Sequence, residues 1–295
     1  CILIGEINDD AHAFGINRIN PGTAINMLHY ERGTKTEYEL ECMRAASRRA
    51  INGHNAAERA FRSGQSEFDI HLAYCRAVDH AEHELPYGNI IALNENGAVL
   101  HYQHQAVEKP TEHRSFLIDA GARFNGYASD ITRTYAKEDG EFASLIQRFE
   151  TLQLELVSEV RAGVEFAELH LSCHLKIAKL LDETGLARGD ADDLIETGVT
   201  SAFYPHGLGH LLGLQVHDVG GHIGDDTGTL IDPPSGHPFL RLTRRLESDQ
   251  VLTIEPGLYV IDMLIDNLRG TPGFEMIDQD MLDWLRPYGG IRIED

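Results

Sequence analysis

Apolar residues recur every three or four positions in several parts of the chain, which predicts amphipathic helices. Thr34 and Glu37 have the spacing of a capping box and begin the first of these helices. The positions that follow at helical spacing are Leu40, Met43, Ser47, Ala50 and Ile51. Ser66 and Asp69 begin a second helix, whose expected core-facing residues are Phe68, Leu72, Ala73 and Val78. Further helices are predicted over residues 142–160 and 166–181.

Short apolar or alternating runs between and after these helices predict strands. These runs cover residues 90–93, 98–102, 115–120, 127–135, 251–260 and 290–294. Because strands clustered beside long helices are typical of α+β proteins, we expect one α+β domain over residues 34–295. Residues 1–33 contain an apolar strand at 1–4, a polar stretch and a turn at Pro21-Gly22. We interpret them as the end of an N-terminal domain with its linker.

Composition and charge narrow the classes of function. Apolar residues make up 42% of the 295, which is ordinary for a globular protein, and the net charge is −22. A surface of that sign repels phosphate backbones and anionic lipids, so we expect neither nucleic acid nor a membrane as partner. The cysteines show no metal or disulfide spacing, which favours reduced thiols and a cytoplasmic protein; they are Cys1, Cys42, Cys75 and Cys173.

The first candidate for chemistry is a predicted hairpin with Asn125-Gly126 as its two-residue turn. Counting outward from this turn, Asp119 faces Thr132, and Asp130 lies on the same face as Asp119, roughly 7 Å away by ordinary sheet geometry. Isolated aspartates more often end strands or bind loop amides. Here, however, Asp119 ends an apolar run, where an unpaired carboxylate would be costly. Two such carboxylates can converge on common cations.

A second candidate is a glycine-rich segment with three histidines within twelve residues, His206, His210 and His217. The glycines argue against a stable helix, so a loop is expected. A single histidine is commonly a satisfied core residue. Three in one loop beside apolar residues favour a cleft, where imidazole serves as metal ligand or proton donor.

Two glutamates complete the set of candidate ligands. Glu255 ends an alternating run that Pro256 terminates, and Glu294 shares one side of the last predicted strand with Arg292. Either glutamate alone could simply face solvent. Together with Asp119, Asp130 and His210, however, they form an oxygen-rich set that suits cations such as Mn²⁺.

Four carboxylates and one imidazole have a chemical consequence. Four carboxylates balance two divalent ions, and a metal pair can lower the pKa of a shared water and polarise a scissile carbonyl. Such a site hydrolyses an amide without a protein nucleophile. The sequence contains no GxSxG motif that would favour a serine hydrolase instead.

Four motifs within these segments, Asp-Ala-Gly, His-Gly-Leu-Gly-His, Thr-Ile-Glu-Pro-Gly and Gly-Ile-Arg-Ile-Glu-Asp, resemble those of the pita-bread metallopeptidases. Within that family the chain is similar to the branch of bacterial Xaa-Pro dipeptidases (prolidases) and organophosphorus acid anhydrolases, from about residue 20 onward. The resemblance implies a creatinase/aminopeptidase-like fold with a mixed, mainly antiparallel curved sheet flanked by helices. It also implies a small peptide substrate, a homodimer, and two divalent ions per subunit, Mn²⁺ before Co²⁺ or Zn²⁺.

The resemblance also assigns roles to residues. Asp119 would bind one metal ion, His210 and Glu255 the other, and Asp130 and Glu294 would bridge the two. The expected catalytic histidines are His101, His206 and His217. The expected substrate-binding residues are Tyr87, Arg241 and Arg292.

The activity implied is hydrolysis of Xaa-Pro dipeptides by a metal-bridging hydroxide. A side activity on organophosphate triesters and P–F bonds is compatible, since tetrahedral phosphorus resembles the tetrahedral intermediate of amide hydrolysis. The alternatives are aminopeptidase P, which acts on longer Xaa-Pro peptides, methionine aminopeptidase, and a non-catalytic pita-bread binding module. This branch normally has a complete N-terminal domain and further strands after the last Ile-Glu-Asp, so we expect the sequence to be part of a longer protein.

Overall fold

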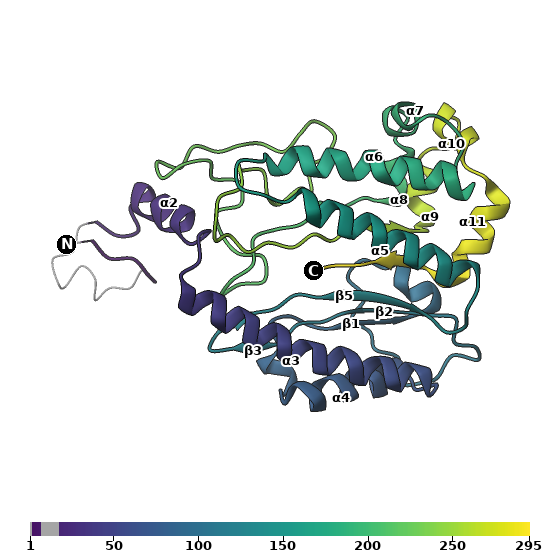
Figure 1. The fold of residues 1–295 in the computed structure, drawn as a ribbon, viewed down its shortest axis with the longest axis horizontal. Helices are drawn as coiled ribbons and strands as arrows, with labels where there is room; N and C mark the ends of the chain where they lie inside the picture. The colour runs from purple at the N-terminus through teal and green to yellow at the C-terminus, as the bar shows by residue number, and fades with distance from the viewer. Residues whose placement is uncertain (1, 7–17) are drawn as a thin grey trace.

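The computed structural model describes residues 2–6 and 18–295 and has the predicted α+β composition (Figure 1). The α-helices are α2 (Gly22–Glu31), α3 (Glu37–Arg62), α4 (Glu67–Val78), α5 (Glu141–Glu159), α6 (Phe166–Thr184), α7 (Ala191–Glu196), α8 (Val199–Phe203), α9 (Asp262–Asp266), α10 (Pro272–Met276) and α11 (Gln279–Leu285). The strands are β1 (Ile90–Leu93), β2 (Ser115–Asp119), β3 (Arg123–Phe124), β4 (Tyr127–Ala128), β5 (Thr132–Ala136), β6 (Gly257–Tyr259) and β7 (Gly290–Arg292). Short 3₁₀ helices are η1 (Glu82–Glu84), η2 (Asn94–Ala98) and η3 (Arg286–Tyr288).

An antiparallel sheet in the order β1-β2-β5 lies between two layers of helices (Figure 1). Helices α3 and α4 lie along one side, and α5 and α6 lie on the other. Alternate residues of β2 face the two sides, so Phe116 and Ile118 pack in the core beneath α3 and α4, whereas Leu117 packs with Tyr102. Burial on both sides explains why β1 and most of β2 are apolar runs without alternation.

Short pairings connect this sheet to the last part of the chain. Strand β6 pairs with β7, and Glu294, just after β7, forms an antiparallel bridge with Thr132 at the start of β5. The large apolar core lies against β6 and β7 and takes residues from α5, α6 and α8. The ends of β2, β5 and β7 thereby meet.

The helix starts were predicted in part. Ser66 caps α4 by accepting a hydrogen bond from the amide of Asp69, as expected. The capping box of α3 instead uses Thr36 and Glu39, two residues after the predicted pair Thr34 and Glu37. Helices α5 and α6 confirm the predictions for residues 142–160 and 166–181.

The predicted core faces contain two errors. Phe68 and Ile51 are 39% and 49% exposed, respectively. The buried side of α4 instead includes Ile70, Tyr74 and Val78, which recur every four residues and contact the sheet. Phe68 lies outside that stripe.

Other local predictions were wrong for identifiable backbone reasons. Residues 98–102 do not form a strand, because Asn94 adopts a left-handed φ of 56° and a 3₁₀ helix and turn follow. Pro21 precedes α2 and does not form an isolated turn. In the run 251–260 only β6 is a strand, since Pro256 has no amide hydrogen to donate.

Two expectations concern the N-terminal region and the cysteines. The strand expected at 1–4 includes Cys1, which lies outside the described residues, and Leu3 forms an isolated bridge with Ile19.

In the described part of the chain Cys42, Cys75 and Cys173 are free and buried. Among the described residues, no helix has both the length and the apolar character to cross a membrane.

Candidate metal centre

The hairpin that carries the two aspartates has the predicted register. Asn125 and Gly126 both have positive φ, 49° and 88°, which is the requirement of a type I′ turn. Phe124 pairs with Tyr127, and Asp119 pairs with Thr132 further out. The pairing of Asp119 with Thr132, predicted by counting outward from the turn, is therefore confirmed.

Between these two paired regions the strands separate into two short sheets. A side chain on Gly121 would place its Cβ 2.0 Å from the carbonyl oxygen of Ser129, so the chain can pass here only with glycine. Ser129 also donates its amide hydrogen to Ala122 O at 3.0 Å. This close approach fixes the strand just before Asp130 and brings its side chain to the end of β2.

Five candidate ligands come from distant parts of the chain, and we call them the carboxylate cluster: Asp119, Asp130, His210, Glu255 and Glu294. Ligand atoms of Asp130, His210 and Glu294 all lie within 4.8 Å of one another. His210 Nε2 lies 3.5 Å from Asp130 Oδ2 and 3.6 Å from Glu255 Oε1. Asp119 lies at the end of β2, close enough to Asp130 for the two charges to repel.

Burial makes the negative charge of this cluster unfavourable. It raises the pKa of Glu255 to about 7, and that of Glu294 well above its ordinary value, and neighbouring carboxylates add to both shifts. Burial also raises the pKa of Asp119, although Arg292 opposes the shift. Burial lowers the pKa of His210, but the contact with Asp130 and the charge of Glu255 outweigh it, so the net shift is upward.

The donor set fits divalent cations. Asp119 Oδ1 is buried and has no hydrogen-bond partner within residues 2–6 and 18–295. A buried carboxylate oxygen without a donor is costly, and a cation would satisfy it together with the repelling carboxylates nearby. Carboxylate oxygens with one imidazole nitrogen are ligands for hard or intermediate ions.

Neighbouring side chains hold the carboxylates in place. Arg292 donates from Nη2 to Asp119 Oδ2 at 2.6 Å, and Tyr87 donates its hydroxyl hydrogen to Asp130 Oδ1. Thr132 donates to Glu294 Oε2 at 2.5 Å. Arg292, expected to contact substrate, therefore contacts a candidate ligand directly.

Sequence reasoning missed the contributions of Thr132 and Tyr259. Thr132 had already been expected opposite Asp119, so strand register could have identified it. Tyr259 accepts a hydrogen bond from Arg292 Nη1 at 3.1 Å, and its hydroxyl lies 2.9 Å from His206 Nε2. Its position four residues after Glu255, at the end of β6, was the available signal.

The candidate catalytic histidines have different environments. His206 Nδ1 lies 2.9 Å from the carbonyl oxygen of Gly207, which can only accept, so Nδ1 carries the hydrogen and Nε2 accepts from Tyr259. Burial lowers the pKa of His206 to about 3. The exposed His217 has its ring centroid 4.4 Å from that of His210. Burial of part of its ring, followed by the charge of His210, lowers its pKa to about 4.

The two remaining predicted residues lie at the surface. His101 and Arg241 are both exposed. Both lie close enough to His217 to lower its pKa, and His101 also lies close enough to His206 to lower the pKa of that ring. Within the described parts of the chain, neither makes a hydrogen bond or ion pair with the carboxylate cluster.

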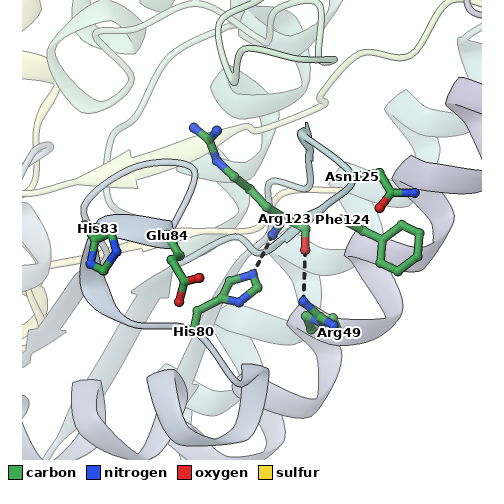
Figure 2. A pocket seen from close by; sticks show the side chains of 7 residues that line it. All are labelled: Arg49, His80, His83, Glu84, Arg123, Phe124 and Asn125. Atoms are coloured by element: carbon green, nitrogen blue, oxygen red, sulfur yellow. Dashed lines mark hydrogen bonds between the residues drawn. The ribbon is translucent and has the colours of Figure 1, made fainter.

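Two hollows lie beside this region. Figure 2 shows the first, of about 430 Å³, where the amide of Arg123 donates to His80 Nε2 and Arg49 donates to the carbonyl of Arg123. It lies beside the hairpin turn, and none of the predicted site residues lines it. The second, of about 240 Å³, is lined in part by His206. The larger hollow is therefore not where the candidate chemistry lies.

Comparison with known proteins gives concordant similarities. The model of metallopeptidase family M24 matches residues 41–295. Xaa-Pro dipeptidases of Shewanella amazonensis and Shewanella oneidensis are each 54% identical over 292 residues, which is 99% of this chain and 66% of each relative. The chain thus spans about two thirds of the length of these curated relatives.

Solved structures are also similar. Zinc-substituted Escherichia coli aminopeptidase P in complex with product has a TM-score of 0.71 and 28% identity, covering 97% of this chain and 58% of that one. The same enzyme with the inhibitor Pro-Leu has a TM-score of 0.71 and 28% sequence identity. The match covers 95% of this chain and 57% of that one. These similarities confirm the predicted pita-bread fold.

Proposed function

The chain belongs to metallopeptidase family M24, and on that premise we propose that it hydrolyses Xaa-Pro dipeptides with two divalent ions. The observation that carries this proposal is the convergence of the carboxylate cluster, whose buried acidic groups require positive charge. The similarity to named Xaa-Pro dipeptidases along 99% of the chain supports the substrate class. We assign this activity to residues 34–295 as the catalytic domain.

In this proposal Asp119 would hold one ion, His210 and Glu255 would hold the other, and Asp130 and Glu294 would bridge the two. The mutual distances of 3.5 and 3.6 Å around His210 Nε2 support a shared site. When bound, the ions supply charge balance, an activated water and polarisation of the scissile carbonyl. The predominance of oxygen donors supports Mn²⁺, with Co²⁺ and Zn²⁺ as alternatives.

The protein's own side chains orient the reaction. His206, His217 and His101 bind substrate or transfer protons, because an imidazole ring has two nitrogens that can donate or accept a hydrogen. Hydrogen bonds from Tyr87 and Arg292 hold the carboxylates of Asp130 and Asp119. In this proposal both residues would also contact the substrate.

Arg241 provides the proposed distinction between dipeptides and longer peptides. A dipeptide has a free carboxylate one residue beyond the scissile bond, and a guanidinium can bind it through two parallel charge-assisted hydrogen bonds. After burial and His210, the charge of Arg241 also lowers the pKa of His217, which indicates that its guanidinium lies near this side of the centre.

Aminopeptidase P is the second candidate activity, because the similar solved structures are of that enzyme. It removes one residue from a longer chain and needs no clamp for a substrate carboxylate. The family resemblance supports a homodimer in either case. Organophosphate hydrolysis would be a side activity of the same centre.

One rate comparison tests the proposal. Purified protein supplied with Mn²⁺ is assayed on an Xaa-Pro dipeptide, on the same sequence extended to a tripeptide, and on a phosphotriester. We expect the dipeptide to have the highest kcat/KM. Faster cleavage of the tripeptide would favour aminopeptidase P, and no peptide cleavage with bound metal would favour the binding module.

A further inference from the structure

Three histidines outside the carboxylate cluster converge beside the 240 Å³ hollow, and we call them the histidine cluster: His170, His174 and His237. His170 and His174 are four residues apart on α6 and share one side of that helix. His237 comes from the long loop that precedes β6. One ligand nitrogen from each lies within 4.8 Å of the other two.

The three rings surround a common point. Their centroids are 4.8 Å apart for His170 and His174, 4.7 Å for His170 and His237, and 4.6 Å for His174 and His237. His170 Nε2 lies 3.0 Å from His237 Nδ1. Around a tetrahedral ion with bonds of about 2.0 to 2.1 Å, neighbouring nitrogens lie about 3.4 Å apart. The distance between His170 Nε2 and His237 Nδ1 would need to increase by only a few tenths of an ångström.

The ring of His174 is oriented for a ligand. Its Nδ1 lies 3.0 Å from Thr200 Oγ1, and its Nε2 is buried with no hydrogen-bond partner among the described residues. A buried polar atom without a partner is unfavourable and calls for an explanation. A bound ion would satisfy it, while Thr200 would hold the ring as outer partners of metal-ligating histidines do.

All three imidazoles are available in the neutral form. Burial lowers the pKa of His170 to about 2 and that of His174 to about 3, and it also lowers that of His237. Protons therefore do not compete for these nitrogens near neutral pH. If His237 carries its hydrogen on Nδ1, that hydrogen moves to Nε2 when the ion binds. This ring is only partly buried, so Nε2 can reach water and no net proton is released.

We propose that His170, His174 and His237 bind one borderline divalent ion, such as Zn²⁺, at a site separate from the carboxylate cluster. Three imidazoles with an open fourth position form a familiar ligand set for Zn²⁺. All three histidines line the 240 Å³ hollow, which leaves space beside them for a fourth ligand. The absence of carboxylates from this donor set makes it a poor site for Mn²⁺, which suits the carboxylate cluster better.

The ring of Tyr204 lies next to both the histidine cluster and His206. The centroid of its ring is 5.0 Å from that of His174 and 4.8 Å from that of His206. His206 and the histidine cluster line the same hollow. The proposed ion therefore has its own ligands but lies next to the wall of the catalytic centre.

The test is a count of bound Zn²⁺ in the purified full chain by equilibrium dialysis and elemental analysis. His237→Gln is the main variant, because His237 is only partly buried and lies on a loop, so the substitution leaves the sequence of α6 unchanged. His83→Gln, a change of an exposed histidine, is the matched control. We expect His237→Gln to bind one Zn²⁺ fewer per chain than the wild type, and the control to bind the same number as the wild type.

The difference in Zn²⁺ count does not depend on peptidase activity or on how many ions the carboxylate cluster holds. The proposal can therefore fail while the proposed function stands. Equal counts for the wild type and His237→Gln would overturn it. His174→Gln is the second variant, with circular dichroism to verify folding, and a folded variant that keeps the ion would overturn the three-histidine set.

Discussion

The carboxylate cluster and the histidine cluster are both buried, but burial affects them in opposite ways. Burial raises the pKa of Glu255 and Glu294 and lowers that of His170 and His174. In both clusters it favours the uncharged form. Neutral imidazoles can remain together without a counterion, whereas adjacent carboxylates repel one another once ionised. Only the carboxylate cluster therefore needs cations to hold its ionised form together at neutral pH.

Removing one bridging carboxylate should have the largest effect. We expect Asp130→Asn to lower kcat by more than about 10³-fold, or about 4 kcal/mol in the barrier, because it weakens a bridge between two cations at constant side-chain volume. The fold should change little. Steady-state kinetics with metal analysis measures both, and near wild-type rates with a single bound ion would contradict the two-ion mechanism.

Histidines beside the centre should separate turnover from metal binding. We expect His206→Ala and His217→Ala each to lower kcat by about 10² to 10⁴-fold, as for the loss of a general acid or base. The metal content should remain nearly that of the wild type. A variant that loses metal would instead identify its histidine as a ligand.

The clamp proposed for the dipeptide carboxylate should affect KM. We expect Arg241→Ala to raise KM for Xaa-Pro dipeptides by a larger factor than for the same peptides amidated at that carboxylate. The difference between the two losses should correspond to about 2 to 3 kcal/mol of binding free energy. Lysine at this position should restore part of the difference, since it supplies charge without the planar fork. Equal losses on both substrates would exclude Arg241 from carboxylate recognition.

The opposite pKa shifts predict opposite pH dependences of stability in the metal-free protein. Glu255 has its folded pKa raised from 4.5 to about 7, so its contribution to stability is lost as pH rises through that window. His174 has its folded pKa lowered from 6.5 to about 3, so its contribution is lost as pH falls through that window.

Two variants distinguish these contributions by chemical denaturation between about pH 5 and pH 7. Relative to the wild type, Glu255→Gln should become more stable as pH rises, and His174→Gln should become more stable as pH falls. The difference in free energy of unfolding between each variant and the wild type should change by up to about 1.4 kcal/mol per pH unit. Parallel curves for either variant and the wild type would mean that the group does not titrate differently on folding.

The carboxylate cluster was more predictable from sequence than the histidine cluster. The register that pairs Asp119 with Thr132 follows from counting outward from a two-residue turn, which Asn125 and Gly126 specify locally. His170 and His174 are four apart on a predicted helix, but their proximity to His237 depends on how a loop 67 residues after His170 packs on α6. No local pattern contains that information.

The errors in predicted structure have a similar cause. Phe68 was assigned to the core from apolar character alone, but the stripe that contacts the sheet is set by Ile70, Tyr74 and Val78. The left-handed Asn94 could not be anticipated, because its side chain is held by Glu112 and Arg114 from a distant loop. Tertiary contacts decided both positions.

The most direct test of the central claim is a titration of the metal-free protein with Mn²⁺, following bound metal and hydrolysis of an Xaa-Pro dipeptide in the same samples. Mn²⁺ suits the oxygen donors of the carboxylate cluster and not the histidine cluster. The account predicts that activity reaches its plateau at two bound Mn²⁺ per chain. Full activity at one bound ion, or hydrolysis without any, would contradict it.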